Sequence, residues 1–193
     1  MSKWRQFTRQ IPLLIIWLMA SALIWGFVFT RITDTARENK IVIFVDAETP
    51  GAAELEMKLN AWARGDIHMV QVRPFSYAML DGSVISNADL YIVKTSDLNT
   101  YQDWFRPYPD DFKSIMPAWE QNGICLAQML SSPLLSHDPY REHIRSEGTE
   151  PYWLCFGANS IHLAGNEGAV DDEAAYFARV LLERNIDYPP ASV

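Results

Sequence analysis

The sequence has little cysteine, and no acidic residue precedes Asp34. Its two cysteines, Cys125 and Cys155, lie inside apolar runs and lack the spacing of a metal site. Buried free thiols are therefore expected, with a disulfide as the alternative. Neither cysteine stands near the N-terminus, so we expect no lipid-anchored precursor. The 193 residues, 49% of them hydrophobic, are enough for one domain with a core and an appendage.

Negative charge is confined to the later part of the chain. Lys3, Arg5 and Arg9 precede an apolar run, and all 24 acidic residues follow it. Beyond those three bases, 13 basic residues stand against 24 acidic ones, a net charge of −11. Such a surface repels phosphate backbones, which argues against nucleic acid as a partner. The acidity is typical of a domain kept soluble by charge rather than of a cation-binding protein.

A run of nineteen residues, from Ile11 to Phe29, holds no charge. At a rise of about 1.5 Å per residue, a helix of this length matches a hydrocarbon core of about 30 Å. The run ends without the small residues of a signal-peptide cleavage site, which favours retention of the helix. The sequence therefore predicts a single-pass protein of the cell membrane, in contact with the lipid bilayer through residues 11–29.

The bases beside this run indicate its orientation. Three stand on each flank, and the α-amino group adds positive charge to the N-terminal side. We therefore expect a cytoplasmic N-terminus and a C-terminal domain outside the cytoplasm. The predicted parts are a cytoplasmic tail over 1–10, a transmembrane signal-anchor helix over 11–30, a tether over 31–39 and an extracytoplasmic α/β domain over 40–193.

Apolar runs and helix-capping patterns alternate after the tether. The β-branched run 40–45 predicts a buried strand, and the next segment predicts a helix with Thr49 as N-cap, Pro50 at its first position and Gly65 as its stop. Further strands are expected at 67–72, 89–93, 123–129 and 152–156, and further helices at 95–105 and 171–185. This order predicts a three-layer α/β domain with a mixed, mainly parallel sheet. The expected core positions of the first and last helices are Leu55, Leu59, Trp62, Ala174, Phe177, Ala178 and Leu181.

The order of several segments resembles a known family. These are KIVIFV (40–45), IHMVQV (67–72), ADLYIVKTSDLNTYQDWFRP (88–107) and YWLCFGANSIHLAG (152–165), the last followed by an acid-capped helix. The chain resembles the extracellular solute-binding proteins of ABC importers, chiefly the carbohydrate-binding branch with a type 2 periplasmic-binding fold. Members of this family usually have two lobes that close over a ligand, but only residues 131–151 stand where the second lobe would be inserted here, so we expect a single lobe. The resemblance also implies a small carbohydrate as ligand.

Polar and aromatic residues follow the predicted strands. In open α/β sheets, ligands bind beyond the carboxyl ends of the strands. A sugar would require aromatic faces beside carboxylates and amides. Ordinary caps, turns and half-buried aromatics are the alternative for the same residues. The predicted ligand-binding residues are Asp46, Glu48, Thr49, Arg73, Tyr77, Thr95, Ser96, Asp97, Trp104, Trp153 and Asn159.

Signatures of metal binding and catalysis are weak. His137 and His143 share a polar segment with Asp138 and Glu142, but histidines six residues apart do not share a helical face, and no metal site is expected.

Ser160, His162 and Asp171 superficially suggest a hydrolase. The chain lacks a Gly-x-Ser-x-Gly turn and a phosphate-binding glycine loop, so no catalytic residue is predicted.

We therefore expect a non-enzymatic, membrane-anchored extracytoplasmic binding or interaction module without a cofactor. Its partner would be a small carbohydrate or a membrane protein. The alternative is a structural or assembly subunit of a membrane protein complex, whose open sheet face docks on another protein and which has no small-molecule ligand. A hydrolase is the third possibility.

Overall fold

A computed structural model of the chain describes most of it. The described residues are 3–33, 35–75, 85–107, 118–121, 124–128, 143–145, 150 and 152–183. Within residues 3–33, side chains are described for 11–26 and 28. The chain divides into two compact units, Met1–Ala36 and Arg37–Val193.

The first unit is built on one long helix, α1 (Lys3–Thr33), which has Pro12 inside it. This helix includes the predicted anchor residues 11–30 and continues beyond them at both ends. Seven consecutive apolar side chains, from Leu13 to Met19, are all exposed, so the helix is apolar on every side rather than along one stripe. Over the residues whose side chains the structure describes, which in α1 are 11–26 and 28, no candidate membrane-spanning helix is found.

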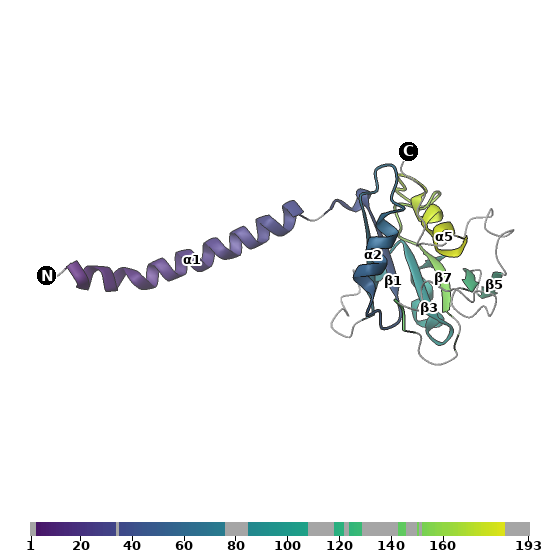
Figure 1. The fold of residues 1–193 in the computed structure, drawn as a ribbon, viewed down its shortest axis with the longest axis horizontal. Coiled ribbons are helices and arrows are strands. Elements are labelled where there is room, and N and C mark those ends of the chain that lie inside the picture. The colour runs from purple at the N-terminus through teal and green to yellow at the C-terminus, as the bar shows by residue number, and fades with distance from the viewer. Residues whose placement is uncertain are drawn as a thin grey trace. The chain divides into compact units, whose positions relative to one another are not determined.

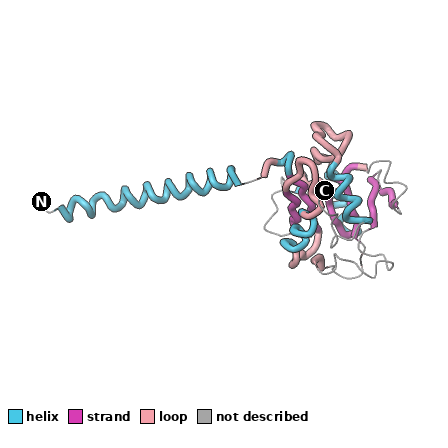
Figure 2. The backbone as a smooth tube through the Cα atoms, turned by 45° about the horizontal axis from the view of Figure 1, so that its top comes forward, coloured by secondary structure: helices cyan, strands magenta, loops and turns pink. Residues whose placement is uncertain are grey.

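The second unit is an α/β domain built on a seven-stranded sheet (Figure 1). Figure 2 shows its strands in magenta among shorter helices and loops. The strands are β1 (Lys40–Val45), β2 (Met69–Pro74), β3 (Leu90–Lys94), β4 (Phe105–Arg106), β5 (Ala118–Gln121), β6 (Ile124–Gln128) and β7 (Tyr152–Gly157). The described helices and 3-10 turns are η1 (Arg37–Asn39), α2 (Ala52–Asn60), η3 (Thr95–Asp97), α4 (Leu98–Tyr101), η4 (Gln102–Trp104) and α5 (Glu173–Glu183).

The strand order is β2-β1-β3-β7-β6-β5, with β4 pairing with β7 off this path. β1 is parallel to both β2 and β3. The other four pairings, β3 with β7, β4 with β7, β6 with β7 and β5 with β6, are antiparallel. The α/β class and the mixed sheet are thus confirmed, and the prediction of a mainly parallel sheet is wrong. Parallel pairing needs a long crossover connection, and of the described pairings only those of β1 are parallel.

Two apolar clusters cover the two faces of the central strands. One cluster joins alternate residues of β1 and β3, such as Ile43 and Ile92, to α2 and α5. The other joins the intervening residues, such as Phe44 and Tyr91, to the segment 98–105. Side chains of a strand alternate between the faces, which is why a continuous apolar run such as KIVIFV requires cover on both sides. The expected core positions of the first and last predicted helices are all buried, although Trp62 lies beyond the end of α2: Leu55, Leu59, Trp62, Ala174, Phe177, Ala178 and Leu181.

The start of α2 differs from its prediction. Gly51 is the N-cap residue, and no side chain caps the helix. Thr49 instead turns its hydroxyl to the carbonyl oxygen of Ala47, at 3.2 Å, so Pro50 lies before the helix. The predicted capping by Thr49 is therefore wrong, because a threonine hydroxyl can also bond to a nearby backbone carbonyl.

Candidate functional site

Polar residues gather at the edge of the sheet where β1 and β3 end. Asp46 follows β1, and Thr95, Ser96 and Asp97 follow β3, which is parallel to β1. β7 runs antiparallel to β3, so its second residue, Trp153, pairs with Val93 near the same edge. Of the residues predicted to bind ligand, these five are brought together.

Asp46 is the innermost residue of this group. Only 3% of it is exposed, and its backbone amide donates to the carbonyl oxygen of Ile92 at 2.8 Å. Its carboxylate oxygen Oδ2 is buried and has no hydrogen-bond partner. No other buried side-chain nitrogen or oxygen in the described ranges lacks a partner. A buried polar atom of this kind costs stability, about 1–3 kcal/mol, so it calls for an explanation.

Burial and a second carboxyl raise the pKa of Asp46 to about 7. Burial has the largest effect, since it disfavours the charged form. Asp97 adds to it, by sharing a hydrogen bond with Asp46 and by repelling its negative charge, whereas Lys94 acts in the opposite direction. Near neutral pH the carboxyl of Asp46 can therefore keep its proton.

Asp97 connects this buried carboxyl to the surface. Its side chain is 38% exposed, and its Oδ2 lies 3.9 Å from Nζ of Lys94, whose side chain is 18% exposed. The pair Asp46–Asp97 thus has a buried member and an accessible member, with one lysine ammonium close by.

Hydrogen bonds fix the backbone and side chains beside this pair. Nε1–H of Trp153 donates to the hydroxyl of Thr95 at 2.7 Å. The backbone amide and hydroxyl of Ser96 both donate to the carboxylate of Glu150, at 2.5 and 3.1 Å. These bonds hold the turn after β3 against the start of β7.

Three further predicted residues lie near this edge but bond elsewhere. Glu48 pairs with Arg145 through an isolated β-bridge and a contact of 3.3 Å between their side chains. Thr49 bonds to the loop backbone, and Arg73 donates to Oε1 of Gln71 on its own strand at 2.9 Å.

Trp104 and Asn159 do not join the group. The ring of Trp104 stacks on Tyr101, with centroids 5.5 Å apart, in the apolar layer over the sheet. Asn159 lies beyond the end of β7, where its side chain donates to the carbonyl oxygen of Ser86 and its own carbonyl accepts from Arg37. Both lie apart from the Asp46–Asp97 pair, and their role as ligand-binding residues stays a prediction. The prediction for Tyr77 lies outside the described residues.

Lys94, Tyr101 and Glu150 belong to this edge and were not predicted. Burial raises the pKa of Tyr101, and the charges of Asp46 and Asp97 raise it further. Lys94 directly precedes the turn Thr95–Asp97, and Tyr101 lies one helical turn after Asp97. This spacing could have indicated from the sequence that both residues lie close to Asp97. Glu150 had none, because it is far from its partner Ser96 in the sequence.

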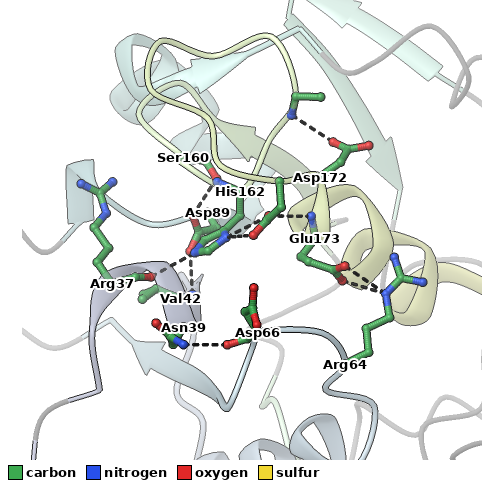
Figure 3. Close-up of polar contacts among 12 residues, drawn as sticks. Arg37, Asn39, Val42, Arg64, Asp66, Asp89, Ser160, His162, Asp172 and Glu173 are labelled. Carbon is green, nitrogen blue, oxygen red and sulfur yellow. Dashed lines mark hydrogen bonds and ion pairs between the residues drawn. The ribbon is translucent and has the colours of Figure 1, made fainter.

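The Ser160, His162 and Asp171 side chains do not form a hydrolase triad. The hydroxyl of Ser160 donates to Oδ1 of Asp89 at 2.6 Å, and it accepts the backbone amide of His162 (Figure 3). Nδ1 of His162 lies 2.9 Å from Asp171, and Nε2 lies 3.0 Å from the carbonyl oxygen of Arg37. Both ring nitrogens are thus engaged away from the serine hydroxyl, whereas a nucleophile needs the imidazole as its base.

Within the ranges that the structure describes, no three side chains of metal-ligating type come together. His143 is buried, and its Nε2 accepts from Nζ of Lys58 at 3.0 Å. The other three members of the segment weighed as metal ligands, His137, Asp138 and Glu142, lie outside the described residues. Cys155 is a buried free thiol, whose pKa burial raises well above its usual value.

No protein-family model matches this chain, and neither a curated protein nor a solved structure does. The resemblance to one lobe of a solute-binding protein therefore stays a prediction.

Proposed function

We propose that this chain is a membrane-anchored, extracytoplasmic binding module whose α/β domain binds a small hydroxyl-bearing molecule, foremost a carbohydrate, at the Asp46–Asp97 pair. The observation that carries this proposal is the buried Oδ2 of Asp46, which has no hydrogen-bond partner. Binding sites keep groups that reduce stability when a ligand supplies the missing interaction. The carboxyl end of a strand in an open α/β sheet is also where ligands bind most often.

The carboxyl pair matches the chemistry of a hydroxyl group. A hydroxyl both donates and accepts hydrogen bonds. The partnerless Oδ2 of Asp46 can accept a hydrogen bond from such a hydroxyl, and Lys94 offsets the negative charge that would otherwise favour a cation. The indole of Trp153, held by Thr95, gives an aromatic surface beside the pair, which suits the apolar face of a sugar ring.

The membrane part of the proposal rests on residues 11–29. This stretch holds no charge, and it lies within the continuous helix α1. A helix that exposes Leu13 to Met19 at consecutive positions buries its side chains only in a surrounding apolar medium or against other chains. The α-amino group and three bases before the run favour a cytoplasmic N-terminus, and hence a domain on the other side.

The two alternative functions have less support. Docking through an open sheet face requires an uncovered face, but both faces of β1, β3 and β7 are packed in apolar clusters. A hydrolase requires a base for Ser160, and the ring nitrogens of His162 are engaged elsewhere.

Calorimetric titration of the full chain in detergent micelles tests the proposed site. A panel of mono- and disaccharides is titrated into the wild type, Asp46→Asn and Asp66→Asn. Asp66 is an exposed carboxylate far from the pair in sequence, so it is the matched control. We expect a bound sugar whose affinity falls by about tenfold or more in Asp46→Asn and not in Asp66→Asn. Absence of binding across the panel, or binding that Asp46→Asn leaves unchanged, would contradict the proposal.

A further inference from the structure

The first residues of the domain are attached to its body through a buried histidine. His162 is fully buried, and its Nε2 lies 3.0 Å from the carbonyl oxygen of Arg37 in η1. Its Nδ1 lies 2.9 Å from each carboxylate oxygen of Asp171. Arg37 itself is exposed, so its carbonyl oxygen could find water if this bond opened. Figure 3 shows the ring of His162 directed at this carbonyl.

Both partners of the ring are hydrogen-bond acceptors. A backbone carbonyl and a carboxylate can each only accept, so both ring nitrogens must carry a proton to satisfy them. That condition defines the imidazolium form. A neutral ring has a single proton, and Asp171 competes for it more strongly than an uncharged carbonyl does. Loss of one proton therefore removes the bond to Arg37.

We propose that His162 is a pH-sensitive clasp, which holds the backbone of Arg37 to the domain when its ring is charged and releases it when its ring is neutral. Release would leave the backbone of Arg37 accessible to solvent and to proteases. This device does not depend on a ligand, and the opening of the clasp does not depend on the membrane anchor.

The charged groups around the ring fix the direction of the effect. Burial alone would lower the pKa of His162, but the bonds to Arg37 and Asp171 and the charges of Asp89 and Asp171 raise it above its usual value. These groups come from η1, the turn before β3 and the segment before α5. A raised pKa means that the clasp is closed below about pH 6.5 and opens as the pH rises through the folded-state value.

The remaining contacts of η1 do not involve His162. The guanidinium of Arg37 donates to the carbonyl oxygen of Asn159 at 2.7 Å, in an exposed position. Asn39 donates to the carbonyl oxygen of Asp66 at 3.0 Å and accepts from the amide of His68 at 2.8 Å. None of the groups in these three bonds changes its charge between about pH 6 and pH 9. Only the bond between His162 and Arg37 therefore depends on pH in this range.

Trypsin cleavage after Arg37 reads out the state of the clasp. The full chain in detergent micelles is digested briefly from about pH 6 to about pH 9, and the cut after Arg37 is quantified by mass spectrometry. Its rate is divided by that of a synthetic peptide of residues 33–42 at each pH, which cancels the pH dependence of trypsin. We expect this ratio to rise about tenfold with pH in the wild type. We expect a high ratio without a pH step in His162→Gln.

Two variants exclude other titrating groups. His68→Gln removes an exposed histidine near η1, and Asp46→Asn removes a carboxyl whose pKa is raised to about 7. Both variants should keep the step. The midpoint of the step should also coincide with the titration of the His162 ring followed by NMR in the wild type, a comparison that does not require His162→Gln to fold. A flat ratio in the wild type, a step that persists in His162→Gln, a step lost in either control or a non-coincident midpoint would overturn the proposal.

Discussion

The backbone amide of Val72, at the outer edge of β2, donates to Oε1 of Glu56 on α2 at 2.8 Å. One helical turn further, Asn60 accepts the amide of Val70 at 2.7 Å. β2 is the last strand of the described sheet on this side, and unpaired amides on an edge strand invite pairing with another chain. Two side chains spaced four residues apart thus close the edge of the sheet.

Removal of this cover should reduce stability. We expect Glu56→Ala and Asn60→Ala each to lower the free energy of unfolding by about 1 kcal/mol, because a backbone donor loses its partner. Met57→Ala is the control, since Met57 is 72% exposed on the same helix. Urea unfolding of the full chain in micelles, followed by tryptophan fluorescence, measures the change. Equal effects of Met57→Ala and Glu56→Ala would show that the edge bonds contribute nothing.

Asp46→Asn should stabilise the domain in a pH-dependent way. The pKa of Asp46 is raised to about 7 from 3.8, so the folded state keeps a proton that the unfolded state releases between these values. Stability from this group is present at acidic pH and is lost as the pH rises towards 7. We expect Asp46→Asn to raise the free energy of unfolding by about 1–3 kcal/mol at pH 8 and by much less at pH 4. Thermal unfolding at the two pH values measures the difference, and equal effects at both would refute it.

Gly157 should tolerate no side chain. A Cβ built on it would overlap the carbonyl oxygen of Ala88, whose neighbour Asp89 accepts the amide of Gly157 at 2.9 Å. We expect Gly157→Ala to cost about 2–4 kcal/mol, since backbone atoms must move. Gly65→Ala is the control, because Gly65 has a φ of 58° but open space around it, which predicts a cost of about 1 kcal/mol. Similar losses of stability in both variants would show that the contact with the carbonyl oxygen of Ala88 does not set the cost.

A buried serine hydroxyl should contribute more to the free energy of unfolding than an exposed one. The hydroxyl of Ser160 donates a hydrogen bond to Oδ1 of Asp89. Asp89 is buried, and burial raises its pKa. We expect Ser160→Ala to cost about 1–3 kcal/mol, because the carboxyl keeps its burial and loses a donor. Ser96→Ala removes a similar bond to Glu150 in an exposed position, which predicts a loss below about 0.5 kcal/mol. Unfolding curves of both variants at one pH make the comparison. Equal losses of stability in the two variants would mean that burial does not determine how much these hydrogen bonds stabilise the domain.

Local patterns predicted much of the fold. KIVIFV forms β1 over the expected residues 40–45, and Asp171, expected at the start of the last helix, accepts the amide of Glu173 there. The i,i+4 spacing of Glu54 and Lys58 likewise places their charged groups 3.5 Å apart on α2. Such features depend on residues that are close in the sequence, which is why a sequence alone can predict them.

Strand direction explains what could not be predicted. The rule on the carboxyl ends of strands correctly joined Asp46 to Asp97, since β1 and β3 are parallel. Asn159, predicted as an amide for a sugar, lies away from this pair, because β7 is antiparallel to β3 and ends on the opposite side of the sheet. An apolar run such as YWLCFG carries no record of its direction in the sheet. The short strands β4 and β5 were missed for a related reason, since pairing with distant strands defines them.

Alkaline carbonate washing of membranes from cells that express the full chain tests most directly that residues 11–29 lie in the lipid. Such washing strips proteins that are held only by surface contacts. We predict that the chain stays with the membrane pellet and leaves it only when detergent is added. Recovery of the chain in the carbonate supernatant would contradict the account.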